Sequence, residues 1–255
     1  MGNQIIHAPI NTSTAKHILD VGCGTGIVTE HLASKFPDAT IYGLDLSPVP
    51  QLRNRPANIH FLQGNIVEQT PDQWQPRNTL NRQGGFDLVY SRLLVCGMIK
   101  WPEFIKKELS LLNPNGWAEI HDVDWVWYDG EDRIVSDAWP WWQTLRAAGE
   151  ERGLDFQCAS RAKQWMEEAG FKDIQVKMYR WPFGGQWEDT PEMRGMGDYV
   201  AQAMPELVWH MIPRMTEGKG SSDEETARMR GDMKRDFAPE KGKHWKFYVT
   251  CGRKP

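Results

Sequence analysis

Short apolar runs alternate with amphipathic stretches in the first half of this chain of 255 residues. Continuous apolar runs predict buried strands, and apolar residues spaced three and four apart predict helices. We expect strands at residues 16–21, 40–45, 58–63, 86–91 and 117–123. We expect helices at residues 27–36 and 101–112, followed by a turn at 113–116. Strands that alternate with helices indicate βαβ units and a largely parallel sheet.

The pattern changes beyond residue 130. Helices are predicted at residues 136–152 and 161–169, and strands at 173–181 and 245–252. The insert at 190–238 predicts two helices, with a polar loop at 218–225 between them. Most of the 11 methionines fall in this insert, and none of the 13 tryptophans precedes Trp74. This skew indicates that the two parts of the chain have different roles.

Charge and composition argue against several classes of protein. A net charge of −4 offers no basic field for nucleic acid. No apolar run approaches the roughly 18 residues that span a membrane, and the first residues do not resemble a signal peptide. The four cysteines lack paired or zinc-like spacing. We therefore expect no metal site, reduced thiols and a cytoplasmic location.

The strongest motif is Asp-Val-Gly-Cys-Gly-Thr-Gly at residues 20–26, between the first predicted strand and the first predicted helix. Glycines at such a place permit a tight turn and let a ligand approach the backbone closely. The spacing is GxGxG, because Ile27 stands where a dinucleotide-binding fingerprint has its last glycine. The motif therefore predicts a small-ligand loop and argues against a dinucleotide.

Polar residues end the neighbouring strands. Asp45 ends the second strand and can accept hydrogen bonds from both hydroxyls of a ribose, although Ser47 close behind it also suits a loop cap. Asn65 follows the third strand and carries a donor and an acceptor for an adenine edge, but an ordinary turn would look the same. Ser91 and Arg92 follow at the fourth strand. Ligands in open α/β sheets bind at such carboxyl ends.

With these residues in view, the chain resembles the class I S-adenosylmethionine-dependent methyltransferases. More narrowly, it resembles the LaeA-like methyltransferases of fungal secondary metabolism. The resemblance rests on HILDVGCGTGIVTEHLASKFP, YGLDLSPV, FDLVYSRLLVCGMIKWPEFIKKELSLLNPNGWAEIHDVDW, EEAGFKDIQVKMYRWPFG and HWKFYVTCGRKP. These segments extend over most of the chain, from about residue 5 to residue 255.

The resemblance implies a Rossmann-like α/β fold, with a mostly parallel seven-stranded sheet, flanking helices and a helical insert before the last strand. It implies one domain over residues 1–255, with a cofactor-binding half at 1–130 and substrate-covering elements at 131–255. Family members usually have a longer lead-in. We therefore expect part of their lid over the cofactor to be absent or supplied otherwise.

The cofactor implied by the resemblance is S-adenosylmethionine. Asp20 and the glycines would surround its amino-acid part, Asp45 would hold the ribose, and Asn65 with Ile66 would hold the adenine. Family members commonly have an acidic residue where Asn65 stands. The predicted cofactor residues are Asp20, Gly22, Cys23, Gly24, Gly26, Asp45, Leu46, Asn65, Ile66 and Ser91.

Candidate catalytic residues lie at the end of the fifth strand. His121 can act as a base near neutral pH, and Asp124 can orient it or act itself. A hydrogen-bonded strand histidine and a loop-capping aspartate are the structural alternatives. Arg92 can grip a substrate carboxylate or enolate, or pair with Asp122. The predicted substrate-binding residues are Arg92, Trp125, Trp127 and Tyr128, whose aromatic members would wall a pocket.

The first hypothesis for function is methylation, on oxygen or carbon, of a small and largely hydrophobic secondary metabolite. The second is a cyclase or pericyclase on the same scaffold, which keeps the cofactor as a fixed positive charge. The third is a LaeA-like regulatory protein. The expected partner is a small molecule, and the sequence leaves the oligomeric state open.

Overall fold

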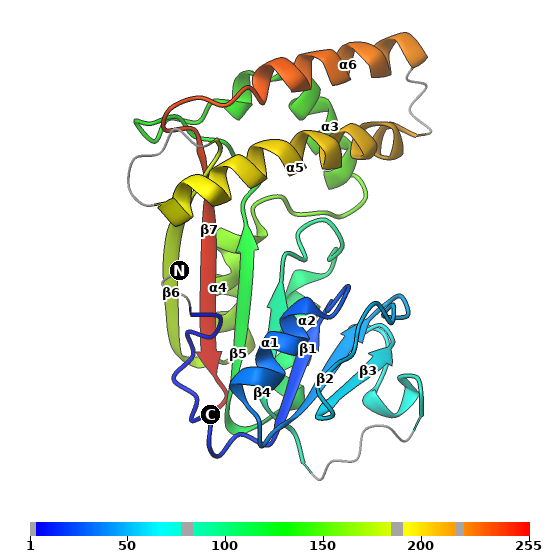
Figure 1. Cartoon of the computed structure of the whole chain (residues 1–255), viewed down its shortest axis with the longest axis vertical. Coiled ribbons are helices and arrows are strands. Elements are labelled where there is room, and N and C mark those ends of the chain that lie inside the picture. Colours follow the sequence, from blue (N-terminus) through cyan, green and yellow to red (C-terminus); the bar gives the residue numbers. More distant parts are fainter. Residues whose placement is uncertain (1–3, 78–83, 185–190, 218–221) are drawn as a thin grey trace.

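The computed structural model of the chain describes residues 4–77, 84–184, 191–217 and 222–255. Within these residues, seven strands form one sheet in the order β3-β2-β1-β4-β5-β7-β6 (Figure 1). They are β1 (His17–Val21), β2 (Thr40–Asp45), β3 (Ile59–Gln63), β4 (Phe86–Arg92), β5 (Leu112–Val123), β6 (Lys172–Pro182) and β7 (His244–Arg253). All neighbouring strands are parallel except β7, which is antiparallel to β5 and β6. The expected mostly parallel, seven-stranded fold is confirmed.

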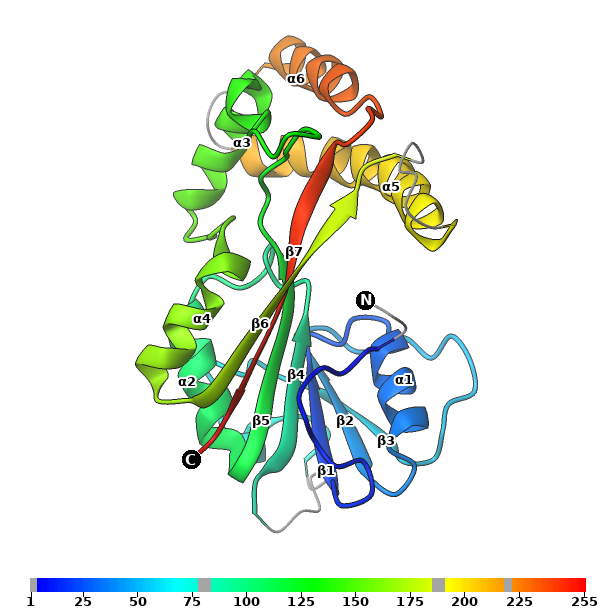
Figure 2. The same ribbon diagram turned by 90° about the vertical axis from the view of Figure 1, so that its left-hand side faces the viewer.

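Helices cover both faces of this sheet. The helix α1 (Ile27–Lys35) lies on one face, and α2 (Trp101–Leu111) and α4 (Cys158–Ala169) lie on the other (Figure 2). Leu32 of α1 is buried in one core cluster, and Phe104 of α2 is buried in a second, larger one. The carboxyl ends of β1, β2 and β3 are left together at one edge of the sheet, which is where α/β proteins bind ligands.

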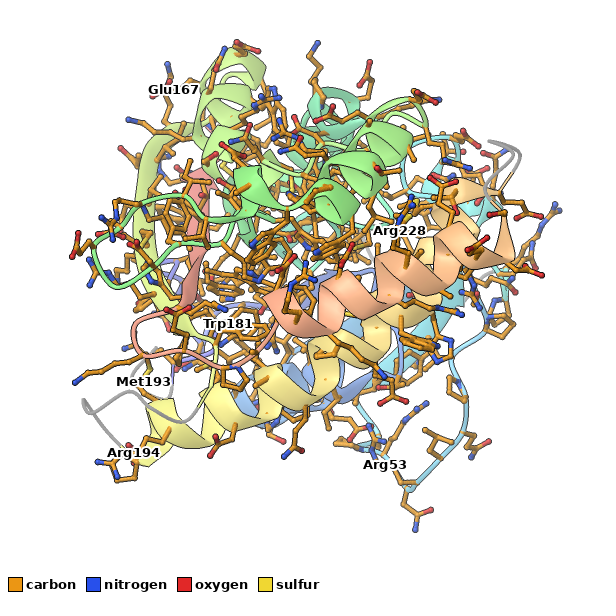
Figure 3. All side chains as sticks on the ribbon, turned by 90° about the horizontal axis from the view of Figure 1, so that it is seen from above. Arg53, Glu167, Trp181, Met193, Arg194 and Arg228 are labelled. Carbon is orange, nitrogen blue, oxygen red and sulfur yellow. The ribbon has the colours of Figure 1, made fainter. Side chains whose placement is uncertain are left out.

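A helical cap lies beyond that edge. In the described residues it consists of α3 (Pro140–Glu150), α5 (Pro191–Thr216) and α6 (Asp223–Asp236) (Figure 1). Seen from above, α5 and α6 run side by side across the molecule (Figure 3). Met204, Met229 and Met233 of these helices are buried in the larger core cluster. No helix in the described ranges is both long and apolar enough to cross a membrane.

Several boundaries differ from expectation. The strand β5 begins at Leu112, because Phe86 pairs with Leu112 and Leu88 with Trp117, so the predicted turn bulges out of a continuing strand. The helix expected from residue 136 begins at Pro140, after a short 3-10 turn. The helix α6 takes in the end of the expected polar loop, because the side chain of Ser222 caps it. The first part of that loop, 218–221, lies outside the described residues.

Candidate active site

The glycine loop between β1 and α1 adopts a backbone conformation that favours glycine. Gly22, Gly24 and Gly26 have φ angles of 66°, 54° and 80°, all in the left-handed region. A Cβ atom on Gly22 would lie 2.4 Å from Cδ2 of Leu94, and one on Gly26 would lie 2.7 Å from the ring of Phe61. A Cβ atom on Gly24 would meet nothing within 4 Å, so this glycine borders open space.

Asp45 ties the end of β2 to the loop. Its Oδ2 accepts the N–H of Gly24 at 2.9 Å, and its Oδ1 accepts the N–H of Ser47 at 3.0 Å. The capping role weighed from the sequence is therefore present. Each carboxylate oxygen keeps a second acceptor site, and the half-buried side chain borders a pocket. The hydrogen bonds by which Asp45 holds the loop are thus compatible with ribose binding.

Asn65 shapes the turn after β3. Its Oδ1 accepts the N–H groups of Val67 at 2.9 Å and of Glu68 at 3.2 Å, and its own N–H donates to Gln69. Both acceptor sites of the side-chain oxygen are therefore used by the turn. The donor-and-acceptor edge expected from the sequence is reduced to a donor, the side-chain amide nitrogen.

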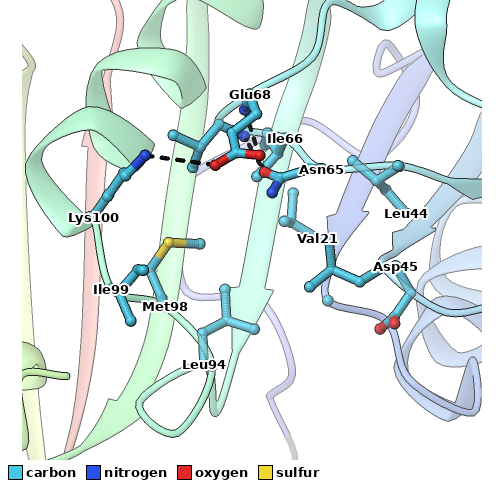
Figure 4. A pocket seen from close by; sticks show the side chains of 15 residues that line it. Val21, Leu44, Asp45, Asn65, Ile66, Glu68, Leu94, Met98, Ile99 and Lys100 are labelled. Carbon is cyan, nitrogen blue, oxygen red and sulfur yellow. Dashed lines mark hydrogen bonds and ion pairs between the residues drawn. The ribbon is translucent and has the colours of Figure 1, made fainter. Parts of the chain in front are cut away.

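A pocket of about 410 Å³ opens at the carboxyl ends of β1, β2 and β3 (Figure 4). Its apolar walls come from Val21, Leu44, Ile66, Leu94, Met98 and Ile99. Nζ of Lys100 lies 3.5 Å from Oε1 of Glu68, which joins the α2 side to the β3 side (Figure 4). Of the predicted cofactor residues, the pocket brings together Gly22, Asp45, Leu46, Asn65 and Ile66. Apolar walls with a few convergent polar groups are typical of small-molecule sites.

Asp20 lies behind the glycine loop and is not among the residues that line the pocket. The hydroxyl of Thr29 donates to its Oδ2 at 2.5 Å, which joins β1 to α1. Burial raises the pKa of Asp20 to about 7, against the opposing effects of Thr29 and of the charge on Arg92. Asp20 therefore supports the loop from beneath.

Cys23 and Ser91 are also buried and do not line the pocket. The Cys23 thiol packs so closely against β2 that a Cβ atom on Gly43 would lie 3.0 Å from its sulfur. Burial raises the pKa of this thiol, which keeps it protonated. In the described residues, no group of three or more His, Cys, Asp or Glu side chains is placed to hold a metal ion.

The segment between β4 and α2 supplies pocket residues that the sequence analysis missed. These are Leu94, Met98, Ile99 and Lys100. Asp122 of β5 holds the segment, because its Oδ2 accepts the N–H of Leu94 at 2.7 Å. Burial raises the pKa of Asp122 to about 7. The available signal was an apolar run directly after a strand whose end already carried polar candidates.

His121 lies away from the pocket and is 1 % exposed. Its Nδ1 lies 3.2 Å from the hydroxyl of Tyr90, and its Nε2 lies 2.6 Å from Oε1 of Glu119. Glu119 also accepts the backbone N–H groups of His7 and Ala8. The structural alternative, a hydrogen-bonded strand histidine, describes these contacts, and the position does not favour a catalytic base.

The contacts of Asp124 also match a structural role, which the sequence analysis considered as a capping aspartate. It is 3 % exposed, and its Oδ1 accepts the backbone N–H of Ser160 in the first turn of α4 at 3.1 Å. Burial raises the pKa of Asp124. The side chain caps α4 and is not among the residues that line the pocket.

The aromatic residues after Asp124 do not wall the pocket as expected. Trp125 and Trp127 are 3 % and 0 % exposed, and Trp142 of α3 packs against both rings. The ring centroid of Trp127 lies 5.3 Å from that of Trp142 in α3. Tyr128 is half-buried, stacks on His244 and carries Nζ of Lys246 3.9 Å above its ring. Trp125 and Trp127 thus belong to the core that joins the cap to the sheet, and Tyr128 lies outside this core cluster.

A family model described as a methyltransferase domain matches residues 7–176. The chain belongs to this family. The cofactor of the family is S-adenosylmethionine, so the cofactor expected from the sequence is confirmed at this level. The glycine loop, Asp45 and Asn65 all fall within the matched residues.

Curated relatives come from fungi. Methyltransferase pytC of Aspergillus terreus is 28 % identical over 261 residues, which cover 100 % of this chain and 76 % of pytC. Methyltransferase str2 of Strobilurus tenacellus is 25 % identical over 206 residues, or 80 % of this chain and 70 % of str2. The secondary metabolism regulator laeA of Aspergillus fumigatus is 30 % identical over 197 residues, or 76 % and 50 %. The resemblance to LaeA-like methyltransferases is confirmed.

Solved structures share the fold at low identity. Haemonchus contortus phosphoethanolamine N-methyltransferase 2 in complex with S-adenosyl-L-methionine has a TM-score of 0.53 at 16 % identity. The match covers 97 % of this chain, which spans half the length of that protein. The cyclase SpnF has a TM-score of 0.52 at 16 % identity, with 95 % of this chain and 76 % of SpnF covered. These matches confirm the Rossmann-like methyltransferase fold.

Proposed function

We propose that this chain transfers a methyl group from S-adenosylmethionine to a small, largely hydrophobic acceptor of fungal secondary metabolism. The observation that carries the proposal is the pocket at the carboxyl ends of β1, β2 and β3, bordered by the glycine loop and Asp45. The fungal relatives pytC and str2, both named methyltransferases, support it. The proposal treats residues 1–255 as one domain whose cofactor site lies in residues 1–130.

The residues present fit this cofactor. Gly24 borders open space and leaves room for a ligand against the backbone. Asp45 keeps acceptor capacity for ribose hydroxyls, and Ile66 offers an apolar wall to the adenine ring. When bound, S-adenosylmethionine supplies an electrophilic methyl group on a sulfonium. The chain would hold the amino-acid part of the cofactor at the glycine loop, the ribose at Asp45 and the adenine beside Ile66 and Asn65.

Positioning is the main contribution that these residues can make. Holding two reactants in near-attack geometry removes much of the entropic part of a barrier. His121 and Asp124 are buried away from the pocket, so the proposal assigns neither of them as a general base. Whether oxygen or carbon is methylated depends on the acceptor.

A non-methylating cyclase is the second candidate. The fold match to SpnF favours it, together with the burial of both predicted catalytic residues. Such an enzyme would convert a polyene without releasing S-adenosylhomocysteine. A regulatory role, as in the relatives named laeA, would instead require a protein partner.

Two measurements test the proposal. Isothermal titration of the whole chain with S-adenosylmethionine and with S-adenosylhomocysteine is expected to give saturable, one-to-one binding. Incubation with S-adenosylmethionine and the polyphenols quercetin and emodin is expected to release S-adenosylhomocysteine with one methylated product. Absence of binding to either form of the cofactor would overturn the proposal. Conversion of a polyene probe without S-adenosylhomocysteine would favour the cyclase.

A further inference from the structure

Arg92 lies at a junction between the glycine loop and β5. It ends β4, and its neighbour Ser91 pairs with Val21, the last residue before the loop. Arg92 itself pairs with His121 of β5. Paired residues on adjacent strands place their side chains on the same face. In agreement with this placement, the charge of Arg92 lowers the pKa of Asp20, against the effect of burial.

The Arg92 guanidinium has no hydrogen-bond or ion-pair partner among the described residues, although its Nε is buried. Asp122, the ion-pair partner considered from the sequence, accepts backbone N–H groups with both oxygens. Asp20 accepts from the hydroxyl of Thr29. Glu119 lies 2.6 Å from the His121 ring nitrogen and accepts two backbone N–H groups. A buried donor without an acceptor is destabilising. A bound ligand can supply the acceptor that the Nε of Arg92 lacks among the described residues.

Aromatic rings continue across the sheet from the position of Arg92. The ring centroid of His121 lies 5.9 Å from that of Phe247, and the ring of Phe247 lies 4.9 Å from that of Trp181. Tyr179 pairs with Phe247, and both Tyr179 and Trp181 are half-buried. The helix α1 and the beginning of α5 lie on the same side of the sheet, and the rest of α5 crosses the end of the sheet toward α3 (Figure 2). The strand pairings put these partly open rings of β6 on the same face of the sheet as Arg92. Aromatic rings and an unpaired guanidinium on one face suit a flat, anionic ligand.

We propose that Arg92 binds the anionic oxygen of the methyl acceptor, and that this acceptor is a conjugated hydroxy compound, a phenol or an enol, bound as its oxyanion. The inference rests on the proposed methyltransferase function and deepens it by naming the acceptor class and the methylated atom. A nearby cation favours the charged form of a bound hydroxyl group. Arg92 therefore takes the place of a general base.

The transfer step balances without a further reactant. The acceptor oxyanion supplies the electron pair of the new O–C bond, and the S–C bond breaks with its electron pair left on sulfur. The hydroxyl proton has already passed to solvent when the acceptor binds, so no proton leaves at this step. The products are a neutral ether and a neutral thioether.

A second anion that Arg92 could bind is the carboxylate of the cofactor's own amino-acid part. The acceptor is the better match, because the aromatic strip formed by Phe247, Tyr179 and Trp181 extends over β7 and β6, away from the glycine loop. A carboxylate held at the loop would leave these rings without a ligand. The two sources differ in which ligand loses affinity when Arg92 is changed.

The test uses 4-nitrophenol, whose phenolate absorbs visible light, and 4-nitroanisole, its uncharged counterpart. The whole chain, saturated with S-adenosylhomocysteine, is titrated with each probe at a pH just below the pKa of free 4-nitrophenol. We expect bound 4-nitrophenol to ionise and to bind at least ~10-fold tighter than 4-nitroanisole. Arg92→Gln should abolish this preference, and Arg92→Lys should keep part of it. Arg228→Gln, on the exposed face of α6, is the matched control and should change neither quantity.

The outcomes separate the alternatives. We expect Arg92→Gln to bind S-adenosylhomocysteine within ~2-fold of wild type, because Arg92 is not among the residues that line the cofactor pocket. An unchanged preference for the phenolate in Arg92→Gln would overturn the inference. A large loss of S-adenosylhomocysteine affinity with the phenolate preference intact would also overturn it and would assign Arg92 to the cofactor carboxylate. If wild type binds no S-adenosylhomocysteine, the proposed function fails, and the probe titration without it still tests Arg92.

Discussion

Oδ2 of Asp45 accepts the backbone N–H of Gly24 at 2.9 Å, so the end of β2 holds the middle of the glycine loop after β1. The same carboxylate borders the pocket. One side chain therefore sets the shape of the loop and presents an acceptor to a ligand, and these two roles respond differently to substitution.

Asp45→Ala removes both roles, whereas Asp45→Asn keeps one acceptor oxygen and loses the charge. Hydrogen bonds to charged groups contribute about 1.5–3 kcal/mol, so we expect S-adenosylhomocysteine to bind ~10- to 100-fold more weakly to Asp45→Ala. Asp45→Asn should lie between this variant and wild type. Titration calorimetry measures the affinities, with Asp232→Ala on α6 as the control. Equal affinities for Asp45→Ala and wild type would show that Asp45 is only a cap.

Gly22 and Gly24 form a matched pair. Both have positive φ, so alanine at either position costs about 1–2 kcal/mol of backbone strain. Only at Gly22 does the new Cβ also meet Leu94, at 2.4 Å, and push that side chain toward the pocket. We expect similar losses of unfolding free energy in Gly22→Ala and Gly24→Ala. The loss of S-adenosylhomocysteine affinity should be greater in Gly22→Ala, and equal affinities would contradict this account.

Glu108 of α2 gives a pH-dependent prediction. It is fully buried, and neither carboxyl oxygen has a hydrogen-bond partner among the described residues. Burial raises its pKa well above the usual range, so the folded protein holds a proton that the unfolded chain releases above about pH 4.3. The stabilising contribution of this group is therefore fully present below about pH 4.3. It is lost as the pH rises from there to the raised pKa of Glu108 in the folded protein.

Two variants of Glu108 separate polarity from titration. Glu108→Met should raise the free energy of unfolding by about 1–3 kcal/mol, because it removes a buried polar group without a partner. The gain should increase with pH. Glu108→Gln should remove only the pH-dependent part. Urea unfolding across the pH range measures both, and a stability gain that does not grow with pH would show that the carboxyl finds a partner.

Trp127 tests the assignment of the aromatic residues to the core. Truncation of a buried tryptophan to alanine costs about 3–5 kcal/mol, so Trp127→Ala should strongly lower the free energy of unfolding. Tyr128→Ala, at a half-buried position, should cost less. Chemical denaturation compares the two. A Trp127 variant of wild-type stability that fails only to bind an acceptor would restore the pocket-wall interpretation.

Local patterns were sufficient to predict most of the sheet and the glycine loop. Buried strands leave continuous apolar runs, and the left-handed conformations of the loop leave glycines at residues 22, 24 and 26. The position of Asp45 beside the glycine loop was predictable because the ends of parallel strands share one edge. The bulge in β5 was not, since it depends on the pairing of Leu88 with Trp117.

Where the structure departs from the sequence-based expectation, the cause is a contact between residues distant in sequence. Leu94 reaches the pocket because Asp122, on another strand, accepts its N–H. Trp127 was assigned to a pocket wall from its residue type, whereas α3 and the segment after α6 close over it. For His121, both a base and a hydrogen-bonded strand histidine were considered, because nothing local showed that Tyr90 lies against its Nδ1 and Glu119 against its Nε2.

Substitutions of His121 distinguish a structural role of this side chain from a role as a general base. His121→Gln keeps a side-chain donor for Glu119, which also anchors the N–H groups of His7 and Ala8. We expect its methyl-transfer rate to stay within ~3-fold of wild type, because loss of a general base would cost roughly 100- to 10,000-fold. His121→Ala leaves the buried Glu119 short of a donor and should lower the free energy of unfolding by about 1–3 kcal/mol. If His121→Gln unfolds like wild type but loses transfer by the larger factor, His121 is a base, and its distance from the pocket must close during catalysis.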